Sequence, residues 1–255
     1  MNQRQKGTIL PIQGRVTRPP GESCRLKIAE LEEKLYNQLI LLVTSAIATI
    51  LMGIYYSKAT FYTMAASTFL LSCFYSYLVF QILKALSLLS NYNLGFKGER
   101  IVGQILSELP GYRAFHDLQF ESYNIDHALV GPGGVYCIET KTRRKSLKGG
   151  GHKVGYDGKR LQFPNGYHDE SALEQAKRNA KALSQFLEKA AAEKVYVKPI
   201  VVIPGWMVNS ERGDYPIPVL NHKQLPQIVS YDKNLTPDQI QRIAFQLDQK
   251  SLMEF

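Results

Sequence analysis

Cysteine and tryptophan are scarce in this 255-residue sequence, which has three cysteines and one tryptophan. Cys24, Cys73 and Cys137 are odd in number and far apart, a pattern that excludes a disulfide framework and a cysteine-based metal site. A reducing, cytoplasmic setting is expected for the soluble part. Repeats and low-complexity tracts are also absent. No short apolar stretch near the start precedes a small-residue cleavage site, which argues against a signal peptide.

Charge is missing from two long stretches, residues 38–57 and 59–83, which Lys58 alone separates. Each stretch is long enough for a membrane-spanning helix, which needs about 20 apolar residues. The alternative is a helical hairpin buried in a soluble core, but uncharged runs of this length are rare in soluble domains. We therefore predict a transmembrane unit at residues 37–84, with helices at about 38–57 and 60–83.

Basic residues predict the orientation of this unit. Seven arginines and lysines precede the first run, and Lys84 and Lys97 follow the second. The positive-inside rule then places residues 1–36 and the soluble domain, residues 95–255, on the cytoplasmic side of a cytoplasmic or inner membrane. The spans hold no ionisable residue, so a transport pathway is not indicated. Small residues such as Gly53 and Ala65 would allow close packing within the hairpin or between chains of a homo-oligomer.

The excess of basic residues gives a formal net charge of +9 and favours anionic partners. Residues 141–160 contain eight of the basic side chains against Asp157 alone: Lys141, Arg143, Arg144, Lys145, Lys148, Lys153, Lys159 and Arg160. Such a run suits a nucleic-acid backbone. Contact with anionic lipid and a solvated loop are the alternatives. The glycines at 149–151 are no phosphate-binding loop, because no Gly-Lys-Ser/Thr follows them.

Residues 124–141 form the predicted β-hairpin around which the soluble domain is organised. Two apolar runs flank the turn cluster at 131–134. A two-residue or a four-residue loop pairs Val130 with Val135, and counting outward sets Asp126 opposite Glu139 and Asn124 opposite Lys141. Directly opposed like charges are destabilising, so this carboxylate pair needs a counter-charge, most commonly a divalent cation.

The elements around the hairpin predict an α/β fold with a mixed sheet flanked by helices. We expect helices from Gly98-Glu99 to Leu109, over 171–193 and from Thr236 onward, and strands at 112–119, 195–204 and 217–220. Both faces of the hairpin are mostly apolar, so helices should cover both. Residues 84–94 are expected to be a helical exit and linker.

Several polar side chains have two explanations. Glu99 lies at the edge of its helix's buried face and is either a site residue or an acid that complements the helix dipole. Gln175 and Asn179 fall on or beside a packing face, where they either bond core backbone or reach a site at the sheet edge. His127 should point away from Asp126 and is interpreted as structural.

Taken in order, these features resemble the NERD (nuclease-related domain) family of the PD-(D/E)xK nucleases over residues 95–204. The matching features are Gly98-Glu99, residues 124–127, Gly131-Pro132, Gly134-Val135, Glu139-Thr140-Lys141 and Gln175. One departure concerns the segment after Lys141. The family usually has Asn there and a Gly soon afterwards, whereas this chain continues Thr142-Arg143-Arg144-Lys145, so its substrate-facing loop should differ.

The resemblance implies a restriction-endonuclease-like fold and metal-dependent cleavage of phosphodiester bonds in DNA or RNA. It implies that Asp126 and Glu139 bind Mg²⁺ (or Mn²⁺), with the Thr140 carbonyl and Glu99 as further ligands. Lys141 would orient the attacking water or stabilise developing charge, and Gln175 would position the substrate or Lys141. Four nearby basic residues would bind substrate: Arg143, Arg144, Lys145 and Lys148. The alternative is a non-catalytic, membrane-anchored scaffold that keeps the fold and binds nucleic acid or lipid.

Overall fold

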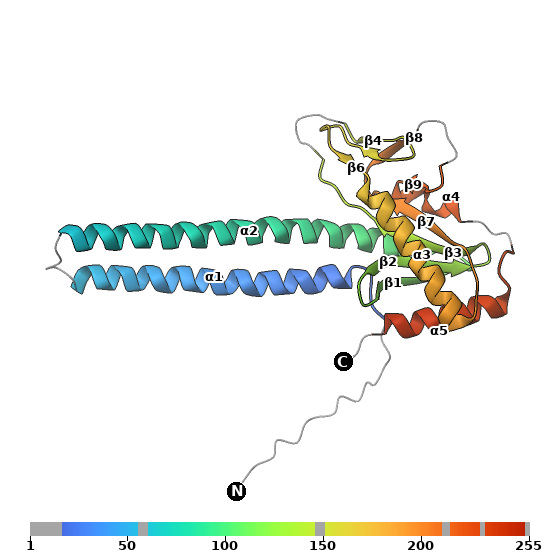
Figure 1. The fold of residues 1–255 in the computed structure, drawn as a ribbon, viewed down its shortest axis with the longest axis horizontal. Helices are drawn as coiled ribbons and strands as arrows, with labels where there is room; N and C mark the ends of the chain where they lie inside the picture. Colours follow the sequence, from blue (N-terminus) through green and yellow to red (C-terminus); the bar gives the residue numbers. More distant parts are fainter. Residues whose placement is uncertain (1–16, 56–60, 146–150, 211–214, 230–232, 253–255) are drawn as a thin grey trace, which may run out of the picture.

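A long two-helix rod and a mixed α/β domain make up the computed structural model, which describes residues 17–55, 61–145, 151–210, 215–229 and 233–252. Helices α1 (Glu22–Tyr55) and α2 (Phe61–Ser107) lie side by side. The remaining elements gather at the end of the rod where α1 begins and α2 ends (Figure 1). At 1.5 Å per residue, α1 is about 51 Å long and α2 about 70 Å, so both are longer than the predicted spans.

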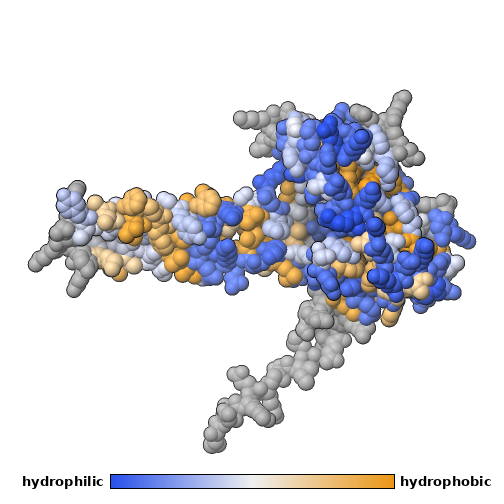
Figure 2. Space-filling view, in the orientation of Figure 1, coloured by the Kyte–Doolittle hydropathy of each residue, from blue (hydrophilic) through white to orange (hydrophobic). Residues whose placement is uncertain are grey.

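Apolar side chains are exposed along the rod. Ile50, Met52, Ile54, Phe69 and Leu70 are each between 63% and 74% exposed, and Figure 2 shows apolar surface along this part of the molecule. Soluble proteins rarely expose contiguous apolar surface on this scale. By length and composition, both helices could cross a membrane.

The expected linker at residues 84–94 and helix start at Gly98 are wrong, because α2 runs unbroken from Phe61 to Ser107. Its glycines mark close contacts instead of a helix boundary. A Cβ atom on Gly98 would lie 2.1 Å from Cγ2 of Thr142, and one on Gly103 would lie 2.5 Å from Cβ of Pro20. Glu99 is therefore far from a helix N-terminus, and the helix-dipole explanation of it falls away.

The main sheet has the strand order β1-β2-β3-β7-β9. Its strands are β1 (Arg113–Gln119), β2 (Asn124–Gly131), β3 (Gly134–Thr140), β7 (Val197–Val202) and β9 (Val219–Leu220). Strand β2 is antiparallel to both β1 and β3, whereas β7 runs parallel to both β3 and β9. Val130 pairs with Val135 and Ala128 with Cys137, as the turn chemistry predicts. The mixed sheet is thus confirmed.

Helices cover both faces of this sheet, as predicted. Helices α3 (Ser171–Ala191) and α5 (Pro237–Ser251) pack on the face that carries Ala128 and Val130. The end of α2, the 3₁₀ turn η1 (His222–Gln224) and α4 (Leu225–Ile228) lie toward the face that carries Leu129 and Tyr136. The candidate site lies between these two layers.

After Lys141, where we expected a loop or a ragged hairpin, residues 153–162 form an antiparallel strand pair that belongs to a second sheet. Its order is β6-β5-β4-β8, with β4 (Lys153–Tyr156), β5 (Leu161–Gln162), β6 (His168–Asp169) and β8 (Met207–Ser210). Its apolar side chains, among them Tyr156, share one core cluster with Val201 of β7 and Leu173 of α3. Two of its strands have only two residues each, which is too short for an alternation pattern to reveal them.

Side-chain alternation fails at one place in the main sheet. Phe115 and Leu118 on β1, and Ile125 and Ala128 on β2, share one core cluster although the members of each pair are three residues apart. Strict alternation predicted Ile125 on the opposite face. The cause is Asp117, whose φ of 49° puts a non-glycine residue in the left-handed region. Such backbone strain concentrates at functional sites.

Candidate active site

The open end of the hairpin holds the predicted carboxylates. Asp126 lies near the start of β2 and Glu139 near the end of β3. The hydrogen-bonded ladder ends at His127 and Ile138, one pair short of the predicted opposition of Asp126 and Glu139. Instead, Oδ2 of Asp126 accepts a hydrogen bond from the backbone N–H of Thr140 at 2.8 Å. Where the two strands separate, the Asp126 side chain therefore accepts the hydrogen bond that links β2 to β3.

Asn179 of α3 holds Glu139. Its amide donates to Oε2 of Glu139 at 3.4 Å and to the backbone carbonyl of Asn124 at 3.2 Å. Asn179 is 1% exposed, and its Oδ1 has no partner among the described residues. Asn179 thus bonds both the backbone of β2 and a site carboxylate, so it fills both of the roles considered for this amide, bonding core backbone and reaching the site. Gln175, one turn earlier, is half-buried and makes no hydrogen bond within the described part of the chain.

Glu99 reaches the same region from α2. The thiol of Cys24, near the start of α1, donates to its Oε1 with a sulfur–oxygen distance of 3.2 Å. Burial raises the pKa of Glu99 to about 8, and the negative charge of Asp126 adds to the effect. Glu99 and Asp126 are therefore close enough for their charges to interact. Sequence spacing gave no argument for this proximity.

All three carboxyl groups are disfavoured as anions. Burial raises the pKa of Asp126 to about 6, although the hydrogen bond from Thr140 opposes the shift. The pKa of Glu139 is raised well above its usual range, first by burial and then by the charge of Asp126. The charge of Lys141, directly after β3, lowers both values. The site thus combines the buried Glu139, the half-buried Glu99 and Asp126, and one neighbouring lysine.

The donor set suits a hard divalent cation in kind, because such ions take carboxylate and carbonyl oxygens. A bound cation would stabilise the three anions against the burial that raises their pKa values. No described residue donates a hydrogen bond to Oδ1 of Asp126 or Oε1 of Glu139, so both oxygens have capacity for a ligand. No three His, Cys, Asp or Glu side chains in the described ranges converge on one point. One reason is that Glu99 is bonded to Cys24.

Two of the predicted substrate-binding residues already have partners. Arg143 forms an ion pair with Asp169 at 2.8 Å, and its guanidinium lies 4.3 Å from the centre of the Tyr167 ring. These contacts fix the second sheet beside Lys141. Arg144 donates to Ser90 at 2.5 Å and Asn91 at 3.1 Å on α2. Because those partners are uncharged, its charge remains available.

The other two predicted residues differ in what the structure says of them. Lys145 is exposed, with its Nζ 5.9 Å from the Trp206 ring centre. Lys148 lies outside the described residues. His127 packs against His116 with an Nδ1–Nδ1 distance of 3.0 Å and is fully buried. The structural interpretation of His127 therefore agrees with its surroundings.

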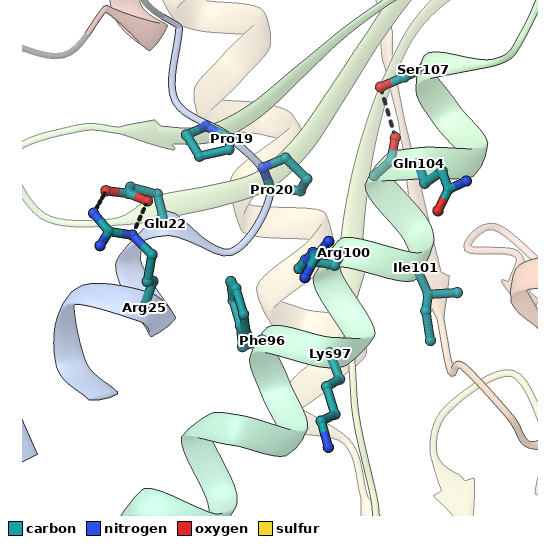
Figure 3. Close-up of a pocket in the computed structure, with 11 residues that line it drawn as sticks. Pro19, Pro20, Glu22, Arg25, Phe96, Lys97, Arg100, Ile101, Gln104 and Ser107 are labelled. Atoms are coloured by element: carbon teal, nitrogen blue, oxygen red, sulfur yellow. Dashed lines mark hydrogen bonds and ion pairs between the residues drawn. The ribbon is translucent and has the colours of Figure 1, made fainter. Parts of the chain in front are cut away.

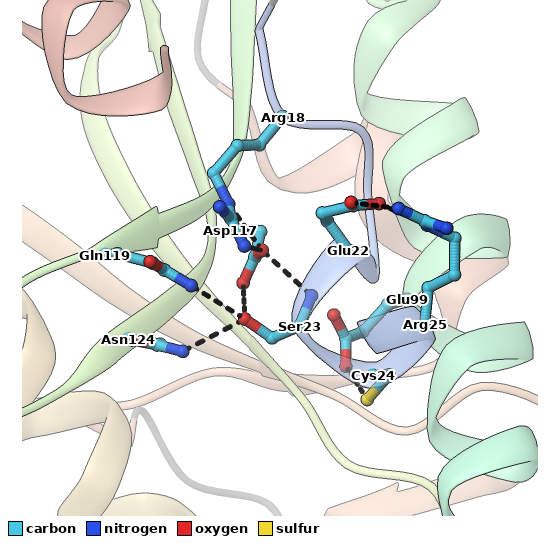
Figure 4. A network of polar contacts seen from close by, with 9 residues as sticks. All are labelled: Arg18, Glu22, Ser23, Cys24, Arg25, Glu99, Asp117, Gln119 and Asn124. Atoms are coloured by element: carbon cyan, nitrogen blue, oxygen red, sulfur yellow. Dashed lines mark hydrogen bonds and ion pairs between the residues drawn. The ribbon is translucent and has the colours of Figure 1, made fainter. Parts of the chain in front are cut away.

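The sequence reasoning missed a polar network between the N-terminal segment and the sheet (Figure 4). Asp117 accepts hydrogen bonds from Arg18 Nε at 2.8 Å, from the backbone N–H of Ser23 at 2.9 Å and from Ser23 Oγ at 2.6 Å. The partners are more than 90 residues apart, so no local pattern links them. One signal was available, an aspartate between Phe115 and Leu118 in an otherwise buried strand.

A groove of about 730 Å³ lies between the start of α1 and the end of α2 (Figure 3). Pro19, Phe96 and Arg100 are among the residues that line it, and none of the three candidate carboxyl groups does. The only acid in its wall, Glu22, is paired with Arg25 at 2.5 Å. The candidate active site therefore lies outside this groove.

Comparison with known families identifies residues 94–204 as a nuclease-related domain, abbreviated NERD. This range contains the whole hairpin, and the mixed α/β architecture is consistent with a nuclease-like fold. No curated protein matches the chain. Among solved structures, Pyrococcus furiosus SfsA in complex with Ca²⁺ superposes with a TM-score of 0.22 and 14% identity, over 61% of this chain and 51% of SfsA. The match spans about half of SfsA, and we draw nothing from so loose a superposition.

Proposed function

We propose that this chain, whose residues 94–204 match the family model of a nuclease-related domain, is a membrane-anchored, metal-dependent nuclease that hydrolyses phosphodiester bonds in DNA or RNA. The observation that carries the proposal is the cluster of Glu99, Asp126 and Glu139. All three have raised pKa values, and no arginine bonds them within the described residues. Perturbed acids of this kind mark functional sites more often than structural ones.

Each residue has a task in this proposal. Asp126 and Glu139 would hold Mg²⁺ or Mn²⁺, together with the Thr140 carbonyl and Glu99. When bound, such an ion supplies a more reactive water and stabilises charge on the phosphate. Lys141 orients the attacking water or neutralises developing negative charge. Asn179 keeps Glu139 in place, and Gln175 faces the substrate or Lys141.

Charge favours a nucleic-acid backbone as the substrate. Residues 141–170 contain eight basic and three acidic residues, more than half of the chain's net charge of +9. This segment begins at Lys141 and continues into the second sheet, so its charges extend outward from the site. Arg144 and Lys145 are both exposed. Lysine and arginine contacts to phosphates supply most of the affinity of such interfaces.

The rod would anchor the domain to a membrane at a distance. The uncharged run ends at Leu83, sixteen residues before Glu99 on the same helix. At 1.5 Å per residue, Glu99 would lie about 24 Å beyond the apolar segment. The potential of anionic lipids is screened within about 8 Å at physiological salt. Nucleic acid could therefore approach without strong repulsion, with both termini and the domain in the cytoplasm.

The proposal is tested by incubating the full chain in detergent with single-stranded and duplex DNA and RNA, with Mg²⁺, Mn²⁺ or EDTA. We expect cleavage that requires metal and that Asp126→Asn and Lys141→Ala abolish. The matched control, Asp157→Asn in the second sheet, should cleave normally. Absence of cleavage from every substrate with either metal would overturn the proposal.

A second function, binding without cleavage, is favoured by one observation. Within the described residues, the site acids do not converge as metal ligands. This function predicts nucleic-acid or vesicle binding that falls with salt and is insensitive to both EDTA and Asp126→Asn. The same samples, measured for binding by fluorescence anisotropy, separate the two functions.

A further inference from the structure

The N-terminal segment that docks beside the candidate site lies outside the nuclease-related match. It consists of residues 17–24, just before and at the start of α1, and we refer to it as the strap. We propose that the strap is a working part of the site, in which Asp117 is a positioning residue that clamps Ser23 and thereby places Cys24 against Glu99. The role of Glu99 rests on the proposed function, but the clamp itself does not.

The clamp is built from buried groups. The Asp117 side chain is 4% exposed and that of Arg18 is 11% exposed, and the two form an ion pair at 2.7 Å. Both carboxylate oxygens of Asp117 also accept hydrogen bonds from Ser23. The left-handed backbone of Asp117 is what turns its side chain toward the strap and away from the core face. Its strain is therefore offset by contacts that reach only residues 18 and 23.

Ser23 lies at the junction of two routes into the site. Its hydroxyl accepts hydrogen bonds from Gln119 at 3.3 Å and Asn124 at 3.2 Å. The carbonyl of Asn124 in turn accepts from Asn179, which bonds Glu139. The next residue along the strap, Cys24, donates to Glu99. Ser23 thus connects through Asn124 and Asn179 to Glu139 of β3, and through the next residue to Glu99 of α2. Figure 4 shows the contacts of Ser23 and Cys24.

The opposite end of the strap is held by the C-terminal helix. The backbone N–H of Arg18 donates to the carbonyl of Ser251 at 2.7 Å, and Thr17 forms an isolated bridge with Leu252. Pro20 packs against Gly103 of α2. The strap is therefore fixed at both ends, and its position depends on the fold of the whole domain.

The contact with Glu99 orients a candidate metal ligand. The Cys24 thiol donates to Oε1 of Glu99 with a sulfur–oxygen distance of 3.2 Å. It also holds Oε1 in one orientation and leaves Oε2 without a bond from the described residues. Serine at position 24 keeps a donor, whereas alanine removes it.

The clamp is tested by alkylation of the full-length protein in detergent with iodoacetamide, with labelling of each cysteine followed by mass spectrometry. We expect Ser23→Ala and Asp117→Asn each to accelerate labelling of Cys24 by about tenfold, the equivalent of one lost hydrogen bond to a charged group. Asp248→Asn is the matched control, because Asp248 pairs with Arg113 of the same strand β1. It should leave the rate at Cys24 unchanged. Buried Cys137 reports that each variant stays folded.

The consequence for the site is measured as Mn²⁺ affinity by calorimetry, without any substrate. Loss of a group that orients a metal ligand weakens metal binding by about tenfold. We expect that loss for Cys24→Ala, whereas Cys24→Ser should bind Mn²⁺ like the wild type. Unchanged Cys24 labelling in both Ser23→Ala and Asp117→Asn overturns the clamp. Equal Mn²⁺ affinity of Cys24→Ala and the wild type overturns the positioning role. A wild type that binds no Mn²⁺ overturns the proposed function, and labelling then still decides the clamp.

Discussion

Asp169 and Glu139 are both buried, at 2% and 4% exposure, yet their surroundings treat the negative charge in opposite ways. Burial raises the pKa of Asp169, but the hydrogen bond from Ser171 and the ion pair with Arg143 outweigh it, so the pKa is lowered overall. Glu139 accepts a hydrogen bond from the amide of Asn179 and forms no ion pair within the described residues, and burial raises its pKa although the charges of Lys141 and Arg178 lower it. The surroundings of Asp169 stabilise its anion, whereas the surroundings of Glu139 disfavour the anion.

The same division holds for other buried acids. Asp117 pairs with Arg18, and Glu193 pairs with Arg242. The fold therefore supplies an arginine to each of these three acids. The acids at the open end of the hairpin form no such ion pair within the described residues, as expected if the proposed metal ion is their counter-charge. The predictions below test this contrast.

The largest effect should come from neutralising the two acids separately. We expect Glu139→Gln to reduce cleavage at least about 100-fold, because it removes a charged ligand, and to raise the melting temperature, because it removes a disfavoured buried charge. Asp169→Asn should cleave at a rate closer to wild type and lose stability. Parallel cleavage assays and thermal melts check both signs. Loss of stability in both variants would mean that the two acids are not of different kinds.

The ion pair itself gives the next effect. Breaking a buried pair destabilises proteins by about 3–5 kcal/mol. The Arg143 side chain is 35% exposed, so the loss for Asp169→Asn should be smaller, about 2 kcal/mol. The double variant Arg143→Met/Asp169→Asn should recover part of it, because no unpaired charge remains. Denaturant unfolding measures the values, and a double variant as unstable as the sum of the singles would show that the pair is uncoupled.

Glu99 makes the contrast depend on pH. The folded chain keeps this proton up to a pKa of about 8, whereas the unfolded chain releases it near 4.5. The folded state thus binds more protons between these values, so the unfolding free energy falls as the pH rises, by at most about 1.4 kcal/mol per pH unit for one group. His116, whose pKa burial lowers to about 4, acts in the opposite direction at lower pH.

The measurement therefore belongs between about pH 6.5 and pH 8, above the unperturbed pKa of histidine. The melting temperature of the metal-free wild type should fall as the pH rises through this window. The melting temperature of Glu99→Gln should depend less on pH. Saturating Mg²⁺ should remove part of the slope from the wild type alone. An equal slope in Glu99→Gln would show that the proton lies elsewhere.

Local rules predicted the hairpin and most of the elements around it, because the strands expected at 112–119, 195–204 and 217–220 and the helices expected over 171–193 and from Thr236 onward are all present. The register from Val130 to Cys137 follows from the turn residues and the period of two, and it is confirmed. The rule failed at Asp117, because a left-handed residue resets the faces and no sequence pattern announces it. Glycines at 95 and 98 suggested a break in α2, yet the helix continues through both despite their low helix propensity, with Gly95 facing Cys24 and Gly98 facing Thr142.

The candidate site was predictable only in part for the same reason. The nearness of Asp126 and Glu139 is a short-range matter of strand pairing. The approach of Glu99 was implied by the family resemblance alone. The strap could not be foreseen, because Ser23 and Asp117 are 94 residues apart and their contact depends on the finished fold. Asn179 was recognisable as a buried amide, but its partner was not.

The smallest expected effect concerns Thr142, which joins Lys141 of the site to Arg143 of the ion pair and packs on Gly98. Gly98→Ala should gain about 1 kcal/mol of helix propensity and lose about 2 kcal/mol to the 2.1 Å clash with Cγ2 of Thr142, a net loss of about 1 kcal/mol. Thr142→Ser removes that methyl group, so Gly98→Ala/Thr142→Ser should be at least as stable as the wild type. Gly53→Ala is the control, because no atom lies within 4 Å of its added Cβ. Thermal melts decide the outcome. A double variant no more stable than Gly98→Ala would mean that the contact between Gly98 and Thr142 does not fix the position of residues 141–143. The surroundings of Glu139 and of Asp169 would then be independent of each other.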